Sequence, residues 1–289
     1  MTLSFREAFF ELVQFVGWFL SIGALGFRFG IVRRLPGRSD EASRILRADN
    51  AALLGVIGVV LLLVAFLGGP YVGSIVEHKT FAEVLPKNLA PFQFRMAMLV
   101  LALIGFSIVR ASPRLGWIVA AAGTVVAVLM PLYTARGWAG RVNAIHILAA
   151  STWLGTLLVL TVVGVRGVIK AGAPGLPRAE LVCDLVNSFS PLALTAASIV
   201  ALTGVTTAWL HLKRLSSLWT TSYGIALVGK LVFVLMVVVM GAWNWKRVRP
   251  SLGETGSEDT IRRSSTMELT FAALVLVATA VLVSLPSPK

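Results

Sequence analysis

Long apolar segments recur along the whole chain of 289 residues and constrain its fold more than any other feature. A helix needs about 20 consecutive apolar residues to cross the hydrocarbon core of a bilayer. Eight segments reach or approach this length, with polar loops between them: residues 9–32, 51–69, 92–109, 115–134, 142–165, 191–212, 225–245 and 266–285. The expected fold class is therefore all-α, a polytopic membrane protein with eight transmembrane helices in a bundle.

The composition agrees with this class and excludes several others. The chain is 57% hydrophobic and only 13% charged, whereas a soluble domain carries about 25% charged residues. The net charge of +13 does not indicate a nucleic-acid partner, because the basic residues lie at span ends and in short loops without interleaved aromatic residues. The single cysteine, Cys183, excludes an intrachain disulfide, and no P-loop for ATP is present.

The distribution of Lys and Arg predicts the orientation in the membrane. Sixteen of the 26 basic residues fall in or beside the odd-numbered loops, nine fall in the even loops and termini, and Lys230 lies within a span. The positive-inside rule then places the odd loops in the cytoplasm and both termini outside, in the periplasm. Residues 9–32 are expected to be a first span rather than a removable signal peptide. Residues 1–136 and 137–289 form two four-helix halves of one integral membrane domain.

All three histidines fall on the external side in this topology. His146 lies about one turn below the external surface in the fifth span, His211 lies at the external end of the sixth, and His78 lies in the second loop. An ionisable side chain within a span is costly and usually marks a functional site, which makes His146 the strongest candidate. His78 is also compatible with a solvated loop, and His211 with an interfacial position.

Three methionines lie at the same level as the histidines. Met96 and Met98 begin the third span and Met130 ends the fourth. Imidazole and thioether ligands together suit copper, and thioether favours Cu(I). No cysteine pair or Glu-x-x-His pattern indicates zinc or a di-iron centre. The candidate copper ligands are therefore His146, His211, His78, Met96, Met98 and Met130, although each methionine alone is also compatible with core packing.

Other polar or aromatic residues within the spans are candidates for a pathway or for structural roles. Trp153 follows His146 by seven residues on the same helical face, and Ser151 and Gly155 form a small-xxx-small pair that allows another helix to approach closely. Lys230 lies within the seventh span, and depth favours its pairing with Glu11 over Glu268. Tryptophans are expected to form an inner belt, with Trp117, Trp243 and Trp245, and an outer one, with Trp138, Trp209 and Trp219.

The C-terminal half resembles the copper resistance protein D family over roughly residues 142–286. Four stretches carry the resemblance in order: His146 with Trp153-Leu154-Gly155; residues 189–194 with Leu202-Thr203-Gly204 and residues 208–212; Thr221-Ser222-Tyr223-Gly224 leading to Lys230; and residues 263–286 with Glu268.

This resemblance implies a multi-pass protein of the bacterial inner membrane, a transporter rather than an enzyme. It implies copper capture at the periplasmic face from a separate periplasmic copper-binding chaperone, followed by movement inward. It makes His146 the first candidate for a metal contact, and Trp153, Lys230 and Glu268 match family positions that are structural or line a pathway.

Two alternatives remain open from the sequence. His146 and His211 lie on consecutive antiparallel helices near one face, so they are also candidates for the axial ligands of a haem b in a quinone-linked redox protein. A structural or assembly subunit of a larger membrane complex is the third class.

Overall fold

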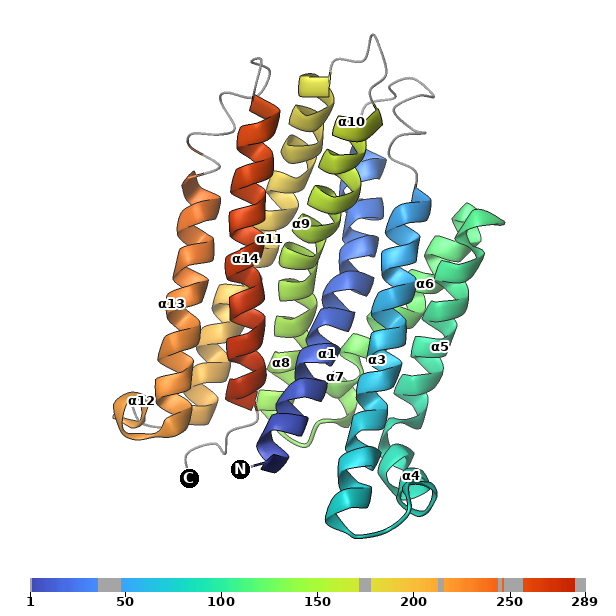
Figure 1. Ribbon diagram of the computed structural model, residues 1–289, viewed down its shortest axis with the longest axis vertical. Coiled ribbons are helices and arrows are strands. Elements are labelled where there is room, and N and C mark those ends of the chain that lie inside the picture. The colour runs from blue at the N-terminus through green and yellow to red at the C-terminus, as the bar shows by residue number, and fades with distance from the viewer. Residues whose placement is uncertain are drawn as a thin grey trace.

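The computed structural model describes residues 2–35, 48–171, 178–212, 216–243, 246 and 257–283, and these residues contain helices and turns but no strand. Long helices lie side by side in one bundle, and the start of α1 lies at the same end as the end of α14 (Figure 1). The principal helices are α1 (Thr2–Gly26), α3 (Ala48–Val76), α5 (Gln93–Ser107), α6 (Pro113–Leu129), α8 (Trp138–Ala150), α11 (Arg178–Leu212), α13 (Ser222–Trp243) and α14 (Ser257–Val283).

Seven segments of the described chain are long and apolar enough to cross a membrane, and each overlaps one of the predicted spans. They are Arg6–Arg34, Asn50–Val76, Ala90–Arg110, Pro113–Thr134, Trp138–Val168, Glu180–Leu210 and Ser222–Trp243. The eighth predicted span coincides with α14, whose described apolar part, Leu269–Val283, is shorter than the others. α14 nevertheless runs along the bundle beside α13 (Figure 1). The all-α, multi-pass membrane class is thus confirmed, with seven of the eight spans meeting this criterion.

The fifth span is one continuous helix with two wide, π-helical stretches. It begins as α8, changes to π-helix at Ser151–Gly155, continues as α9 (Thr156–Val159), changes again at Leu160–Val165 and ends as α10 (Arg166–Ala171). Single π-helical turns inside α-helices are often found at functional sites. α1 is likewise followed by a π-helical turn, Phe27–Ile31.

α1 crosses the fifth span where both helices carry glycine. A Cβ on Gly23 would meet the backbone of Gly155, and a Cβ on Gly155 would meet the carbonyl group of Phe19. Two helix backbones come this close only when neither has a side chain at the crossing. The close approach predicted from Ser151 and Gly155 is confirmed, and α1 is the helix that makes it.

The hydrophobic core surrounds α1, and it includes an indole that the sequence analysis placed in a membrane-surface belt. Trp117 is 2% exposed and packs edge-on against Phe106 and Phe29, with ring centroids 5.8 and 6.3 Å away. The belt assignment of Trp117 is therefore wrong, because the face of α6 that carries it turns toward the bundle. The predicted belt residues Trp138, Trp209, Trp219 and Trp243 are all exposed, and Trp245 lies outside the described residues.

Arg95 on α5 joins four helices near one end of the bundle. Its guanidinium lies over the rings of Trp18 on α1 and Phe66 on α3, 5.3 and 4.8 Å from the centroids. Its Nε donates a hydrogen bond of 2.8 Å to the carbonyl oxygen of Ala127 on α6. Glu11 is close enough for its charge to attract Arg95. A planar cation between two rings therefore holds α1, α3, α5 and α6 together.

Replacing Arg95 by methionine is expected to destabilise the protein by about 3 kcal/mol, because two cation–π contacts and a charged hydrogen bond are lost together. Arg95→Lys keeps the charge without the planar fork and should fall between the wild type and Arg95→Met. Thermal denaturation in detergent measures the order. Equal melting temperatures for all three proteins would contradict this structural role.

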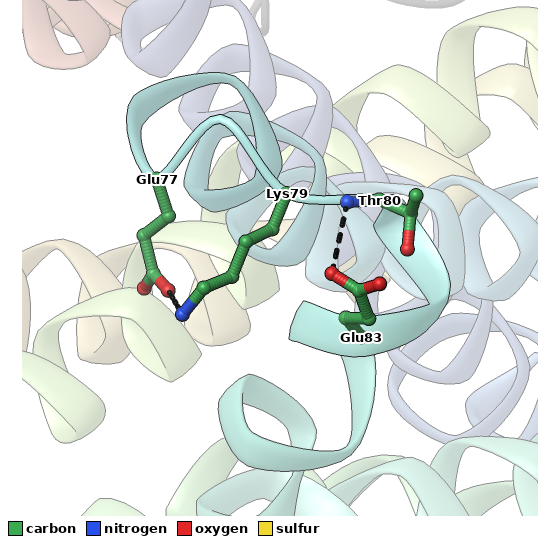
Figure 2. Close-up of polar contacts among 4 residues, drawn as sticks. All are labelled: Glu77, Lys79, Thr80 and Glu83. Atoms are coloured by element: carbon green, nitrogen blue, oxygen red, sulfur yellow. Dashed lines mark hydrogen bonds and ion pairs between the residues drawn. The ribbon is translucent and has the colours of Figure 1, made fainter.

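A tight turn and a short helix follow α3 at the end of the bundle where α1 begins (Figure 1). Lys79 pairs with Glu77 at 3.0 Å, and the Thr80 N–H donates to the Glu83 carboxylate at 3.4 Å (Figure 2). Lys79 holds the pKa of Glu77 below its ordinary value through this hydrogen bond and its charge. The second contact caps α4 (Phe81–Leu89) in a capping box.

Candidate functional site

His146 on α8 faces α11 and forms a hydrogen bond with it. Its Nδ1 lies 2.9 Å from Thr203 Oγ1. The next residue of α11, Gly204, leaves room for the imidazole, since a Cβ there would lie 3.3 Å from His146 Cε1. The sequence placed Thr203 and Gly204 within the family resemblance but assigned them no role. The sequence pattern that could have identified them is a hydroxyl-bearing residue next to a glycine, on the helix that follows the one carrying His146.

The hydrogen bonds of Thr203 favour a proton on Nδ1 of His146. The Thr203 hydroxyl has one hydrogen, and it donates this to the carbonyl oxygen of Ile199 at 2.6 Å. In this assignment its oxygen accepts a hydrogen bond from His146 Nδ1–H, and the imidazole also donates a hydrogen bond to the backbone carbonyl of Val200. The lone pair of the neutral imidazole is left on Nε2, which is the arrangement found in histidines that bind metals. The contact thus prepares His146 to act as a ligand through Nε2.

Lys230 on α13 lies at the same depth as His146. α8 and α13 both begin at the end of the bundle where α12 (Ser217–Thr220) joins α11 to α13 (Figure 1). His146 and Lys230 each lie eight residues from the start of their helices, about 12 Å along the axis at 1.5 Å per residue. The positive charge of Lys230 acts on the imidazole of His146 and disfavours a positive charge on that ring.

The surroundings of His146 contain cationic and neutral groups but no carboxylate from these helices. α8, α13 and residues 191–212 of α11 include no Asp or Glu in their sequences. Arg141 lies five residues before His146 on α8, with its guanidinium 5.5 Å from the centre of the Trp138 ring. Within the described parts of the chain, no group of three or more His, Cys, Asp or Glu side chains is placed to hold a metal ion.

The other two histidines lie apart from His146. His211 follows Thr203 by eight residues on α11, an offset of about 12 Å along the helix, and its side chain lies outside the described residues. His78 is exposed in the turn after α3 with a φ of 51°, a left-handed conformation that is uncommon for a residue with a side chain. The offset of His211 does not favour a haem held between His146 and His211.

The three candidate methionines are half-buried, and two of them belong to the core. Met96 and Met98 pack against the hydrophobic core from α5, which contacts α3 and α6. Met130 lies where α6 gives way to α7 (Pro131–Thr134), at the same end of the bundle. Figure 1 shows α5 and α11 on opposite sides of the bundle, so Met96 and Met98 are separated from the face of α8 that carries His146.

The remaining candidates have varied environments. Trp153 is buried in the core within the first π-helical stretch of the fifth span. Glu11 on α1 is half-buried, and the basic residue whose charge acts on it is Arg95, not Lys230 as its depth had suggested. The side chain of Glu268 on α14 lies outside the described residues.

Comparisons with known proteins support the resemblance seen in the sequence. Residues 184–282 match the family model described as copper resistance protein D. This match includes Thr203 and Lys230 but begins after the helix that carries His146. The chain is also 30% identical over 144 residues to "Copper transport protein CutJ" from Bacillus subtilis (strain 168), covering 50% of the chain and 25% of that relative. The chain thus matches about a quarter of the relative's length. No solved structure matches.

Proposed function

Because its residues 184–282 match the family model described as copper resistance protein D, we propose that this chain handles copper in the bacterial inner membrane. The observation that carries the proposal is the pairing of His146 with Thr203, which leaves an imidazole lone pair free inside a membrane bundle. Copper is the transported substrate in this account, captured at the periplasmic face and moved inward. A periplasmic copper-binding chaperone is the proposed donor. The matched relative is named as a copper transport protein, which is consistent with this role.

Orphaned hydroxyl groups along the fifth span support an inward route. Ser151 Oγ and Thr156 Oγ1 are fully buried, and neither has a hydrogen-bond partner among the described residues. They lie five and ten residues beyond His146, toward the opposite end of the bundle. A buried hydroxyl without a partner costs about 1–3 kcal/mol, so its presence calls for an occupant such as water. Thr156 Oγ1 lies against Gly26 on α1, next to the close crossing at Gly155, so passage of copper past these hydroxyls requires α1 to move away from the fifth span.

Uptake by proteoliposomes tests the transport proposal. Purified protein is reconstituted into vesicles that contain a copper chelator, and copper is added outside. We expect copper to accumulate faster than in empty vesicles, and an inside-negative potential to increase the rate if net positive charge crosses, since 100 mV contributes about 2.3 kcal/mol per charge. Accumulation equal to that of protein-free vesicles would overturn the proposal.

The Thr156→Val variant tests whether the Thr156 hydroxyl lies on the route of copper through the bundle. Valine has nearly the same shape, so removal of an unpaired hydroxyl should leave the protein as stable as the wild type or more stable. If the route passes this point, uptake slows while copper affinity stays unchanged. The uptake assay and a melting curve measure both effects. Unchanged uptake would place the route elsewhere in the bundle.

Thr203→Val is expected to weaken copper binding about 10- to 100-fold, the usual effect of losing a group that orients a ligating histidine. The substitution removes the acceptor for His146 Nδ1–H while keeping the shape of the side chain. Thr203→Ser keeps the hydroxyl and is the matched control, with affinity near that of the wild type. Competition against a copper chelator measures the affinities. Equal binding by Thr203→Val and Thr203→Ser would contradict the role of this hydrogen bond.

A further inference from the structure

Two buried hydroxyl groups of the fifth span lack the hydrogen bond that their neighbours make. Thr152 and Thr161 each donate to the carbonyl oxygen four residues back, at 2.8 Å. Serine and threonine inside a helix ordinarily make this backward bond. Ser151 and Thr156 are fully buried, yet their hydroxyl groups have no partner among the described residues. Within the described part of the chain, a change of helix shape at these two residues therefore breaks no hydrogen bond of their side chains.

The same two residues mark the ends of a wide turn. Ser151 begins the first π-helical stretch and Thr156 follows it directly. The hydrogen bonds of a π-helix join residues five apart, so these two lie one above the other. Gly155 and Thr156 both face α1, against Phe19 and Gly26 respectively. If this turn tightened to α-helix, the residues after it would rotate by about 100° relative to those before it, the rotation of one α-helical residue.

The crossing between α1 and the fifth span cannot be opened by side chains alone. A Cβ on Gly155 would meet the carbonyl group of Phe19, and one on Gly23 would meet the backbone of Gly155. The contacting atoms belong to the backbones of two helices, so no rotamer change separates them. A passage at this level requires a movement of the helices themselves.

The fifth span has the features needed for such a movement. α9 contains four residues, and the second π-helical stretch, Leu160–Val165, follows it. A hydrogen-bonded π-helical turn holds one residue more than an α-helical turn. If the first stretch tightens while the second widens, α9 turns about its axis while α8, with His146, and α10 keep their places.

We propose that α9 is the gate of the copper route and that it rotates between the two π-helical stretches. Rotation turns Gly155 out of the crossing and brings a residue with a side chain, Leu154 or Thr156, against α1. α1 then moves away, and water reaches the buried hydroxyl groups. The structure is the closed state in this account. The inference rests on the proposed function and adds how the tight crossing opens.

Cysteine labelling without copper tests the motion. Thr156→Cys is made in a Cys183→Ser background, and its reaction with a small water-soluble thiol reagent is timed in proteoliposomes. Thr124→Cys is the matched control, because Thr124 is also fully buried with no hydroxyl partner among the described residues but lies in the regular helix α6. We expect Thr156→Cys to react about 10-fold faster or more, since local opening is easiest at a moving segment. Equal rates would overturn the gate.

Deletion of Leu154 tests the role of the wide turn. It leaves four residues in the first stretch, which then form an α-helical turn that keeps Gly155 and Thr156 directed at α1. Because no extra residue remains to be exchanged, the labelling rate at Thr156→Cys should fall to that of the Thr124→Cys control, and copper uptake should fall with it. Fast labelling in the deletion variant would overturn the rotation.

The labelling and the uptake assay fail separately. Copper uptake by the wild type with equally slow labelling at both cysteines overturns the gate and leaves copper transport intact. Fast labelling at Thr156→Cys without copper uptake by the wild type overturns the proposed transport. Melting curves show whether the deletion variant is folded, and the comparison of the two cysteines decides the question without it.

Discussion

Replacement of Gly155 by alanine is expected to destabilise the protein by about 3 kcal/mol or more. The added Cβ would lie 3.0 and 3.1 Å from the carbonyl carbon and Cα of Phe19, and closer still to its carbonyl oxygen. These atoms belong to the backbone of α1, so no side-chain rotation can relieve the clash. α1 would have to move away from the fifth span, and its contacts with the rest of the core would move with it.

Gly229 provides the matched control for this substitution. It also lies within a membrane helix, α13, but a Cβ there meets nothing within 4 Å. Gly229→Ala should therefore be neutral or stabilising by up to about 1 kcal/mol, because alanine favours helix more than glycine does. Thermal denaturation in detergent, together with the yield of monodisperse protein, measures both variants. A Gly155→Ala protein that melts at or above the wild-type temperature would contradict the close crossing.

His146→Ala is expected to lower copper affinity by about 100-fold or more, exceeding the effect of altering a residue that only orients a metal ligand. The substitution removes the imidazole that the hydrogen bond with Thr203 orients. Competition against a chelator at fixed pH measures the loss. The melting temperature should change little in comparison with Gly155→Ala, because His146 is half-buried and its partner Thr203 retains its bond to Ile199.

His78→Ala is the histidine control for this experiment. His78 lies in an exposed turn outside the membrane helices, so its removal should leave the affinity of the His146 site nearly unchanged. A similar loss of affinity in both variants would show that the ligands come from the external turn as well. Wild-type affinity in His146→Ala would remove His146 from the copper site.

Much of the fold could be predicted because hydrophobic length is a local property of the sequence. The seven segments that meet the criterion for spans overlap the predicted ones, and the close approach at Gly155 follows from residue size alone. The rotation of each helix about its axis, by contrast, depends on contacts with residues that are distant in the sequence. Trp117 was placed at the membrane surface although it is buried, because the aromatic residues that cover it come from α5 and from the end of the first span.

The candidate site could also be predicted only in part, for the same reason. His146 could be singled out because an imidazole inside a span is exceptional, whereas Thr203 is one of many hydroxyl-bearing residues in apolar helices. Its role depends on a contact across 57 residues of sequence. Depth alone suggested that Glu11 would pair with Lys230. α5 instead brings Arg95 to Glu11 on α1, because the Arg95 guanidinium lies over Trp18 of α1 and Phe66 of α3.

The orientation of the bundle and the direction of transport remain predictions from the Lys and Arg distribution. Cysteine accessibility at each end of the bundle would test the first of these in intact cells, independently of copper. The exposed turn at residues 77–80 offers a suitable position, because a small reagent can reach it without entering the membrane. Labelling from the periplasm is expected there, and protection until the membrane is permeabilised would reverse the orientation.

The metal content of the purified wild-type protein tests the central claim most directly. Elemental analysis and an absorption spectrum are recorded on the same sample, after growth with copper and purification without chelators. We predict stoichiometric copper and no Soret absorption. A protein that carries haem, or one that retains no copper, would contradict the assignment of this membrane bundle to copper handling.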